Sequence, residues 1–501
     1  MIRKILVANR GEIARRVFRT ARELGIATVA VYSEADASAP YVREADESAL
    51  IGPAEASASY LRADVILDVA AHLGVDGIHP GYGFLSERAD FSDACRARGM
   101  AFIGPSGDAM RKLGTKADAK ALARLASVPC VPGVESATGD LAELRDGATK
   151  IGYPVMLKAS SGGGGRGMRV VHDPAAFDEE FHRASEEAVK SFGDGTMLVE
   201  KYVANPRHVE VQFIADGFGN IATLYERECS IQRRHQKLIE EAPAARSVNW
   251  DGMREAVRNL VREANYQNAG TAEFIVDPAT GEFYFLEVNA RLQVEHPVTE
   301  LITGVDLVAE QIRVASGLTL SIPAELMAGN RSLIHGHAIE IRVVAENAER
   351  GFIPSLGKIV GWAEPRHPSV RVDSGFEVGS EVTRHYDSML AKIIAHGPDR
   401  ATAVRRLRAA LDDFHVLGVE TNLGLMREVL DSPSFLAGDL DTGFIGRFLV
   451  ERTAPPIPGW VANIAAMATS GSAASTEAGP SAHAIAGAWQ SDGFRNATSG
   501  R

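Results

Sequence analysis

The amino-acid sequence predicts a mixed α/β and α+β protein with three successive folded regions. Apolar strands alternate with amphipathic helices over residues 1–113, which predicts a doubly wound α/β domain. Paired strands surround a glycine-rich segment over residues 114–330, and a second strand-rich stretch followed by a helix covers residues 335–448. Residues 449–501 include a long stretch of Ala, Ser, Thr and Gly, which is typical of a flexible linker.

Composition excludes several classes of protein. A length of 501 residues corresponds to about three domains, and the net charge of −12 gives no electrostatic support for nucleic-acid binding. No apolar stretch approaches the ~18 residues that a membrane span needs. Cys95, Cys130 and Cys229 lack CxxC spacing, so neither a disulfide framework nor a structural zinc site is expected. The N-terminus does not have the pattern of a signal peptide, and we therefore expect a reducing, cytoplasmic location.

The first region opens with a β–α–β unit. A strand at Lys4–Ala8, a helix at Gly11–Leu24 and a strand at Thr28–Tyr32 are predicted from apolar runs and helical spacing. The pattern continues with a helix at Leu61–Leu73, a strand at Gly77–His79, a helix at Glu87–Arg98 and a strand at Ala101–Ile103. The turn after the first strand lacks the GxGxxG pattern, so no dinucleotide site is predicted.

The second region reads as antiparallel. After a helix near Lys116–Ala126, hairpins are predicted from His208–Ala215 with Ile221–Glu226 and from Thr271–Val276 with Glu282–Val288, because both connectors have turn composition. In the third region we expect strands at His337–Val344, Gly357–Trp362 and Val382–Tyr386, followed by a helix at Arg400–Asp412.

Four consecutive glycines, Gly162–Gly165, lie between strands predicted at Tyr153–Ala159 and Met168–His172. A backbone without side chains can approach phosphate oxygens closely, and Lys158 just before the loop could pair with their charge. No Gly-Lys-Ser/Thr follows, so this is not a Walker A loop. Two interpretations stay open: a mobile hairpin tip without a ligand, and a nucleotide-binding loop that closes over phosphates.

Polar and apolar residues alternate strictly from Leu286 to Glu295, in the order LEVNARLQVE. In an extended chain the polar side chains would all line one face. A half-exposed strand is the usual cause of such alternation. Here the polar residues are carboxylates, amides and a guanidinium instead of the Lys, Thr and Ser expected of a solvent-facing strand, which favours a functional site.

A neighbouring strand brings one more carboxylate to this face. If Val276 pairs with Glu282 across a five-residue turn, Glu273 lies opposite Phe285 and diagonal to Glu287, with Cα atoms roughly 7–8 Å apart. Glu273, Glu287 and Asn289 would then offer only oxygen ligands, which suit Mg²⁺ or Mn²⁺. The sequence therefore predicts a divalent metal site close to the glycine-rich segment.

The segment Gln232–Lys237 (QRRHQK) is basic and is flanked by Glu226, Glu228, Glu240 and Glu241. Taken alone, such a run favours a solvated charge patch. The functional alternative is an anion site, in which the cations stabilise phosphoryl or carboxylate groups.

Together these motifs resemble the biotin carboxylase subunit or domain of biotin-dependent acyl-CoA carboxylases, which belong to the ATP-grasp superfamily. The resemblance covers roughly residues 1–448, and the matching motifs occur in the family's order: Lys4–Ala14 (KILVANRGEIA), His79–Glu87 (HPGYGFLSE), Ser161–Met168 (SGGGGRGM), Glu226–Pro243 (ERECSIQRRHQKLIEEAP) and Glu287–Glu300 (EVNARLQVEHPVTE). It implies a Rossmann-like pre-ATP-grasp domain, an ATP-grasp domain whose lid covers about residues 131–203, and a C-terminal biotin carboxylase domain.

The resemblance also implies a role for each matching residue. ATP would be bound by Lys116, Lys158, Glu200, Lys201 and Val203, with His208, Gln232 and His235 nearby and Gly162, Gly163, Gly164 and Gly165 as a lid over the phosphates. Mg²⁺ or Mn²⁺ would be bound by Glu273, Glu287 and Asn289. Bicarbonate would be held by Arg291, Gln293 and Val294, with Glu295 as general base, Lys237 offsetting charge, and Arg342 binding phosphate and the biotin enolate. Asp387 matches a residue at the family's dimer interface.

The activity implied is carboxylation of biotin through carboxyphosphate. The family's biotin-attachment motif, Met-Lys-Met, does not occur in this sequence, so biotin is expected on a carrier protein or another segment, with a carboxyltransferase as a further partner. Residues 488–495 are similar to the entry into the next domain of long carboxylase α chains, so we expect a shortened or truncated relative of those chains. Two alternatives remain: an ATP-grasp ligase for another carboxylate, and a catalytically silent regulatory subunit.

Overall fold

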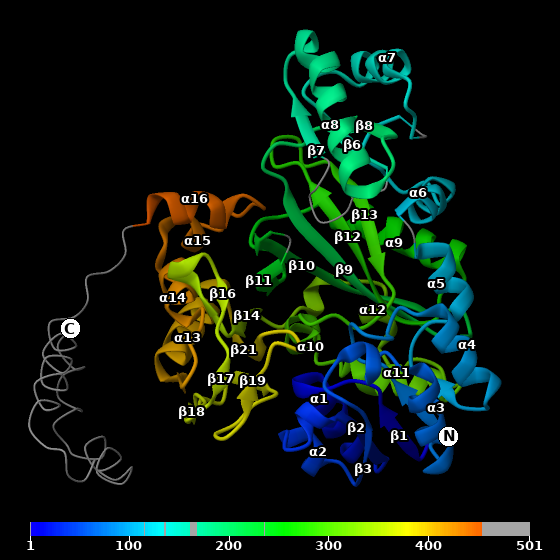
Figure 1. The fold of residues 1–501 in the computed structure, drawn as a ribbon, viewed down its shortest axis with the longest axis vertical. Coiled ribbons are helices and arrows are strands. Elements are labelled where there is room, and N and C mark those ends of the chain that lie inside the picture. Colours follow the sequence, from blue (N-terminus) through cyan, green and yellow to red (C-terminus); the bar gives the residue numbers. More distant parts are fainter. Residues whose placement is uncertain (1, 115, 135–136, 161–167, 235, 453–501) are drawn as a thin grey trace, which may run out of the picture. The chain divides into compact units, whose positions relative to one another are not determined.

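The computed structural model describes residues 2–114, 116–134, 137–160, 168–234 and 236–452. The chain divides into two units, Met1–Phe448 and Leu449–Arg501, and the description below concerns the first (Figure 1). The predicted linker at residues 449–501 lies almost wholly outside the described residues. In the described part of the chain, no helix is both long and apolar enough to cross a membrane.

A parallel five-stranded sheet is built from the first part of the chain. Its order is β3 (Glu47–Gly52), β2 (Ala27–Ser33), β1 (Lys4–Val7), β4 (Gly77–His79) and β5 (Ala101–Phe102). The accompanying helices are α1 (Gly11–Glu23), α2 (Pro40–Glu44), α3 (Ala63–His72), α4 (Ala89–Ala97) and α5 (Gly107–Leu113). Because the strand order reverses direction at β1, the predicted doubly wound arrangement is confirmed.

A small lobe at the top of Figure 1 contains a three-stranded antiparallel sheet and two helices. Its elements are β6 (Val155–Ala159), β7 (Met168–Val171), β8 (Met197–Lys201), α7 (Leu141–Ile151) and α8 (Phe177–Phe192), and α6 (Lys116–Leu125) precedes it in the chain. The alternating apolar residues of β6, Val155 and Leu157, pack against Phe177 of α8 in a separate core. Both predicted strands beside the glycine run therefore exist, and the run itself lies outside the described residues.

The largest sheet has eight strands, in the order β13-β12-β9-β10-β11-β14-β21-β19. Their bounds are β9 (Arg207–Ala215), β10 (Ile221–Arg233), β11 (Gln236–Ala242), β12 (Asn268–Val276), β13 (Phe283–Asn289), β14 (His337–Val344), β19 (Val370–Ser374) and β21 (Met389–Gly397). Both predicted hairpins are present, but β10 continues through the basic segment to Arg233 instead of ending at Glu226. Strands on both sides of residue 335 therefore share one sheet, since β11 pairs with β14.

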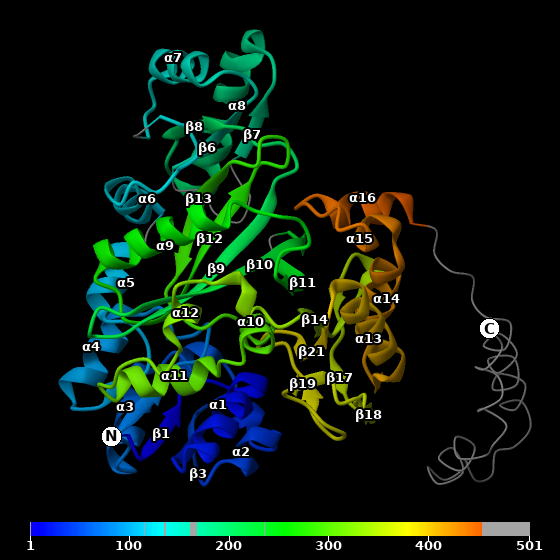
Figure 2. The ribbon, with the colours of Figure 1, turned by 180° about the vertical axis from the view of Figure 1, so that it is seen from behind.

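Helices cover this sheet and short strands extend beyond it. In Figure 2, α9 (Trp250–Ala264), α11 (Leu307–Ala315) and α12 (Ala324–Met327) lie in front of the sheet. The remaining helices are α10 (His296–Thr303), α13 (Arg400–Asp413), α14 (Leu423–Asp431), α15 (Pro433–Leu436) and α16 (Phe444–Glu451). The single strands predicted at Gly357–Trp362 and Val382–Tyr386 were wrong in extent: the first is split into β17 (Gly357–Lys358) and β18 (Gly361–Ala363), and the second is only β20 (Glu381–Val382). The split occurs because Val360 pairs its N–H with Leu417 while Gly357 and Lys358 pair with β20. The short strands β15 (Glu346–Asn347), β16 (Ile353–Pro354) and β22 (His415–Leu417) complete the set.

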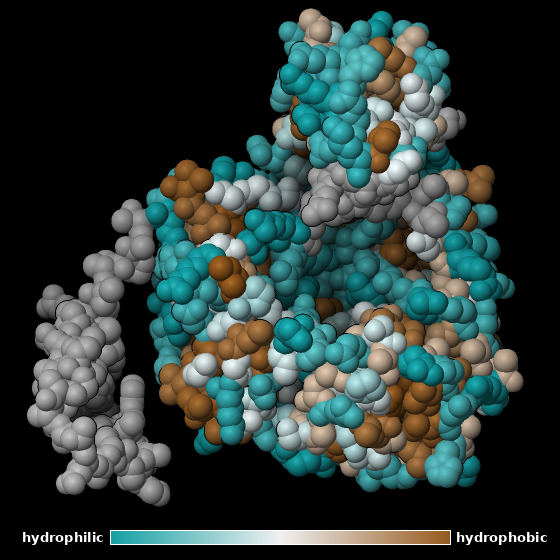
Figure 3. All heavy atoms as spheres, viewed as in Figure 1, coloured by the Kyte–Doolittle hydropathy of each residue, from teal (hydrophilic) through white to brown (hydrophobic). Residues whose placement is uncertain are grey.

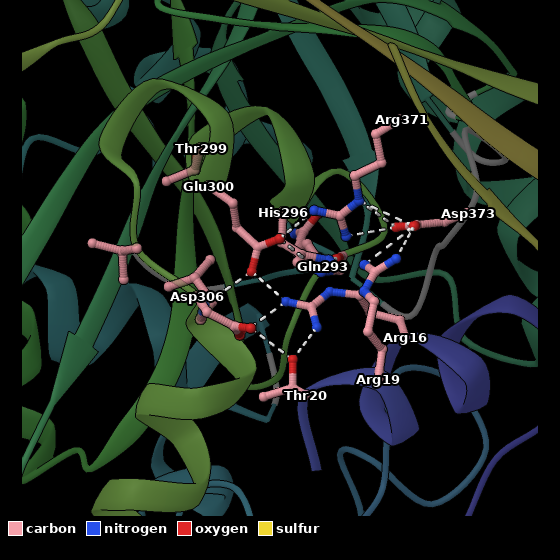
Figure 4. Close-up of polar contacts among 12 residues, drawn as sticks. Arg16, Arg19, Thr20, Gln293, His296, Thr299, Glu300, Asp306, Arg371 and Asp373 are labelled. Carbon is pink, nitrogen blue, oxygen red and sulfur yellow. Dashed lines mark hydrogen bonds and ion pairs between the residues drawn. The ribbon is translucent and has the colours of Figure 1, made fainter. Parts of the chain in front are cut away.

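A buried network of ion pairs joins α1, α10 and β19 (Figure 4). Glu300 of α10 accepts hydrogen bonds from Arg16 Nη2 at 2.6 Å and from Arg371 Nη1 at 2.7 Å. Arg16 also donates to Asp306 at 2.9 Å, and Arg371 donates to Asp373 at 2.6 Å. Glu300 therefore links the first and the last folded parts of the chain to α10.

Replacing this carboxylate tests how much the network stabilises the fold. We expect Glu300→Gln to lower the free energy of unfolding by about 3–5 kcal/mol, because two buried guanidinium groups lose their shared counter-charge. Asp178→Asn is the matched control, since Asp178 pairs with Arg145 at the surface and its loss should cost at most about 1 kcal/mol. Denaturant unfolding of both variants measures the difference, and equal losses would contradict the role given to Glu300.

Candidate functional site

The alternating run LEVNARLQVE does not stay extended. Strand β13 ends at Asn289, residues 290–295 form a loop with a turn, and α10 begins at His296. The prediction of one strand through Glu295 was therefore wrong for its second half. The sequence contains a reason, since Pro297 lacks the N–H that a strand ladder needs and is favoured in the first turn of a helix.

The pairing of β12 with β13 also differs from the prediction. Asp277 and Glu282 close the turn, because the Asp277 N–H donates to the Glu282 carbonyl at 2.8 Å, so Val276 pairs with Phe283 and not with Glu282. A bulge between Glu273 and Phe274 then restores the parity and places Glu273 directly opposite Glu287. The predicted diagonal relation of the two carboxylates was wrong, and their predicted position on one face of the hairpin was right.

The ammonium of Lys237, on β11, lies at the centre of the polar cluster. Its Nζ donates to Glu210 at 2.6 Å, Glu295 at 2.7 Å, Glu273 at 2.9 Å and Gln293 at 3.2 Å. Glu210 comes from β9 and Glu273 from β12, while Gln293 and Glu295 come from the loop before α10. Acceptors from two strands and one loop thus converge on the Lys237 ammonium.

Arg342, on β14, reaches the same loop from the opposite side. Its Nη2 donates to Glu295 Oε2 at 2.9 Å and its Nε donates to Glu240 Oε1 at 2.6 Å. Because Lys237 binds Glu295 Oε1, each oxygen of the Glu295 carboxylate faces a different cation. Glu240 pairs in register with Glu340, whose carboxylate oxygens have no hydrogen-bond partner among the described residues.

Burial and charge act in opposite directions on the acids of this cluster. Burial alone would raise the pKa of Glu295, but Lys237, Arg342 and Arg227 outweigh it and hold that pKa far below its ordinary value. Burial raises the pKa of Glu240 to about 7, with Arg342 opposing the rise and Glu295 adding to it. Glu295 is therefore a carboxylate at neutral pH. An anionic ligand that drew Lys237 and Arg342 toward itself would raise the proton affinity of Glu295.

The three predicted metal ligands lie together at the end of the β12–β13 hairpin. Asn289 Nδ2 donates to Glu273 Oε1 at 2.8 Å, and Asn289 Oδ1 accepts from Arg291 Nη2 at 2.9 Å. His208 Nε2 lies 2.8 Å from the other oxygen of Glu273. Two carboxylates and an amide oxygen form a donor set that fits a hard divalent cation such as Mg²⁺.

The residues predicted to bind nucleotide are only partly described. Glu200 of β8 accepts hydrogen bonds from Lys158 of β6 and Lys120 of α6, and these cations lower the pKa of Glu200 although burial opposes them. Lys201 ends β8, and Val203 is buried beside Val131 and Tyr284. Gln232 Nε2 lies 3.4 Å from His208 Nδ1. Outside the described residues, or without a described side chain, are Lys116, Gly162, Gly163, Gly164, Gly165 and His235.

Sequence reasoning missed several members of the cluster. Arg227 is fully buried on β10 and donates to Glu210 at 2.5 Å and to Gln212 at 2.8 Å, so it supports the acid that holds Lys237. A signal was available: His208, Glu210 and Gln212 alternate with apolar residues on β9, as the polar residues of LEVNARLQVE do. Lys120 and Glu87, which binds Arg291 at 3.1 Å, had no such pattern.

A hollow lies on the face of the folded unit that carries the large sheet. Figure 3 shows that it is lined mainly by hydrophilic residues, and comparison with Figure 1 places it over β9, β10 and β12. These are the strands that carry the buried side chains of Glu210, Arg227 and Glu273.

Comparison with known proteins identifies the family. Residues 1–110 match the model described as biotin carboxylase, N-terminal domain, residues 115–323 match carbamoyl-phosphate synthase L chain, ATP binding domain, and residues 340–447 match biotin carboxylase C-terminal domain. A biotin carboxylase from Campylobacter jejuni, whose structure is described as a β-γ-ATP complex, is 42% identical, with a TM-score of 0.81 over 89% of this chain and 99% of that one. The chain belongs to the biotin carboxylase family.

Other relatives of this chain are subunits or domains of named carboxylases. The methylcrotonoyl-CoA carboxylase subunit alpha of Oryza sativa subsp. japonica is 49% identical over 89% of this chain and 60% of its own length. The human propionyl-CoA carboxylase alpha chain is 47% identical over 88% and 60%. The chain thus spans about 60% of the length of such curated relatives. The biotin carboxylase domain of 2-oxoglutarate carboxylase from Hydrogenobacter thermophilus, described as a dimer with MgADP, ADP and bicarbonate, is 42% identical, with a TM-score of 0.81 over 91% and 100%.

Removing the central ammonium tests the electrostatics of the site. The depressed pKa values of Glu273 and Glu295 contribute stability above the unfolded value of about 4.3, and that stability is lost as pH falls below it. Lys237→Met removes the cation that depresses both. We therefore expect its deficit in Tm against the parent protein to be large at pH 7 and to shrink as the pH falls below about 4. Lys4→Met is the control: it removes a partly exposed ion pair with Glu47 and a hydrogen bond to the Leu73 carbonyl, both far from these acids, and its deficit should not change with pH over this range. A Lys237→Met deficit independent of pH would contradict the assignment.

Proposed function

We propose that this chain catalyses the ATP- and bicarbonate-dependent carboxylation of biotin on a carrier domain, through carboxyphosphate. This is the first half-reaction of an acyl-CoA carboxylase. The observation that carries the proposal is the position of Glu295 between two cations, Lys237 and Arg342, beside the oxygen donors of Glu273, Glu287 and Asn289.

Bicarbonate would bind at Gln293, Val294 and Glu295 in the loop between β13 and α10, with Arg291 at the start of that loop. Arg291 holds its guanidinium between Glu87 and Asn289, which supports a role in orienting a planar anion. Lys237 and Arg342 would then interact with the bicarbonate anion and less strongly with Glu295. The Glu295 carboxylate is then free to take the bicarbonate proton as the bicarbonate oxygen attacks the γ-phosphate of ATP; the bond from the γ-phosphorus to the bridging oxygen breaks, ADP leaves and carboxyphosphate forms.

Glu273, Glu287 and Asn289 would hold Mg²⁺ or Mn²⁺, which supplies charge neutralisation for the phosphates when bound. Lys158 and Lys120 both pair with Glu200. When nucleotide binds, these two lysines would pair with phosphate oxygens in place of this carboxylate. Lys116, Lys201 and Val203 would contact the nucleotide, and Gly162–Gly165 would form the lid. His208, Gln232 and His235 would lie near the nucleotide. Arg342 would in addition face the phosphate released from carboxyphosphate.

Partners and location belong to the same proposal. We propose a biotin carrier domain and a carboxyltransferase as partners, as the names of the carboxylase α-chain relatives suggest. A homodimer through this module is supported by the dimer described for the Hydrogenobacter relative, with Asp387 as a candidate interface residue. A cytoplasmic site is proposed from the free cysteines Cys95, Cys130 and Cys229, while several relatives are named mitochondrial.

The proposed function is tested by ATP hydrolysis with and without bicarbonate and free biotin. We expect hydrolysis to require bicarbonate and to rise with biotin. Hydrolysis indifferent to both would favour a ligase for another carboxylate, and no hydrolysis under any condition would favour a silent subunit.

The role of Glu295 is tested by Glu295→Gln, which keeps the shape of the side chain and removes its basicity. We expect the rate to fall by about 10²–10⁴-fold while ATP affinity, measured by calorimetry, stays within twofold. Glu325→Gln, on the exposed face of α12, is the control and should leave the rate unchanged. A normal rate for Glu295→Gln would overturn its assignment as the base.

The metal assignment predicts a separate behaviour. Glu287→Gln should raise the Mg²⁺ concentration needed for half-maximal hydrolysis by about 10–100-fold, because one anionic ligand is lost. Excess Mg²⁺ should restore much of the rate. Glu282→Gln, at the far end of the same hairpin, should need no more Mg²⁺ than the parent protein. An unchanged Mg²⁺ requirement in Glu287→Gln would contradict the site.

A further inference from the structure

Lys392 is a buried cation that the proposed chemistry does not use. It lies on β21 and is fully buried, although lysine is almost never buried without a partner. Its Nζ donates to the backbone carbonyl of Val294 at 2.7 Å. Glu12 Oε2 lies 3.4 Å away and Asp373 Oδ2 lies 3.9 Å away, so the closest contact of the ammonium is with an uncharged carbonyl.

That carbonyl belongs to the loop that carries the proposed bicarbonate residues. A peptide unit is planar, so holding the Val294 carbonyl also orients the N–H of Glu295 and the start of its side chain. The preceding carbonyl is held as well, because His296 Nδ1 lies 2.7 Å from the oxygen of Gln293. His296 is fully buried, and burial together with nearby cations keeps its pKa well below the ordinary value, so the neutral ring donates through Nδ1.

The two carbonyls therefore have buried donors on one side of the loop, while the side chains of Gln293 and Glu295 meet Lys237 on the other. The donors themselves are held by the wider network. Figure 4 shows Gln293 and His296 beside Glu300, Arg371 and Asp373, and Asp373 pairs in register with Lys392 across β19 and β21. Lys392 thus connects the strands of the last folded part to the loop without touching the substrate site.

We propose that Lys392 is a positioning residue for bicarbonate, which acts by fixing the peptide between Val294 and Glu295. This inference rests on the proposed function, because bicarbonate is the ligand assigned to the loop. The Lys392 side chain supplies a hydrogen-bond donor to the partly buried Val294 carbonyl, and its removal would leave that oxygen without this partner. The other contacts of Lys392, with Glu12 and Asp373, balance its charge, so they need not contribute to substrate binding.

Lys392→Met tests the role, since it keeps the apolar stem and removes the donor. We expect the KM for bicarbonate to rise about tenfold or more, as for loss of a group that orients a ligand-binding residue, and kcat to fall, while the KM for ATP stays within twofold. Arg371→Met is the matched control: it removes a cation from the same network without a hydrogen bond to the loop, and it should lower Tm but leave both KM values unchanged.

Two further variants protect the test against simple misfolding. Glu12→Gln alone keeps the Lys392–Val294 hydrogen bond and should keep the bicarbonate KM. Glu12→Gln combined with Lys392→Met removes one uncompensated carboxylate and should fold where the single Lys392→Met does not, with the bicarbonate KM still raised. A bicarbonate KM within twofold of the parent in either Lys392 variant, or an equal rise of both KM values, would overturn the inference.

Amide hydrogen exchange supplies a readout that does not need activity. Lys392→Met should speed exchange in the segment 290–299, and Arg371→Met should leave that segment close to the parent. Unchanged exchange in Lys392→Met would overturn the positioning role. If the parent protein lacks bicarbonate-dependent hydrolysis, the proposed function fails, and faster exchange in Lys392→Met would still support the structural part of the inference.

Discussion

The arrangement of the site depends on the need to compensate the charge of Lys237, whose side chain is largely removed from water among the strands of the large sheet. An ammonium removed from water is stable only where counter-charges and acceptors surround it. Glu210, Glu273 and Glu295 supply them from two strands and a loop, and Arg227 in turn compensates Glu210. Of these acids, Glu273 is a proposed metal ligand and Glu295 is the proposed base. The proposed catalytic groups therefore pair with one another, and an anionic substrate and a metal cation would replace these pairs.

Two layers of polar residues keep that arrangement in place. The inner layer holds the side chains around Lys237 and Arg342, and the outer layer holds the backbone of the loop through Lys392 and His296. The outer layer is continuous with the ion pairs around Glu300, which draw on Arg16 near the start of the chain and Arg371 near its end. Distant parts of the sequence are thereby joined to α10, the helix that follows the loop.

The sequence was sufficient to predict most elements and several members of the polar cluster. Periodicity predicted the β–α–β start and both hairpins, and the polar face of LEVNARLQVE drew attention to Glu287, Gln293 and Glu295. It was not sufficient for register, because a bulge beside Glu273 shifts pairing by one residue without leaving a pattern. Partners such as Arg227 and Lys392 escaped notice because an isolated charge in a strand looks the same whether it is solvated or buried. Only the packing of separate strands distinguishes the two.

The continuity of the eight-stranded sheet limits how the protein can be divided. Strands β11 and β14 meet in its interior, where Ile239 pairs with Ile341 and Ala242 with Ala338. A cut near residue 335 would leave each fragment with a bare edge of unpaired N–H and C=O groups, which readily captures another chain. Fragments made there would tend to aggregate or to recombine with one another. In recombination between relatives, crossovers near residue 335 should therefore be disfavoured, and the ATP-binding and C-terminal segments should come from the same parent.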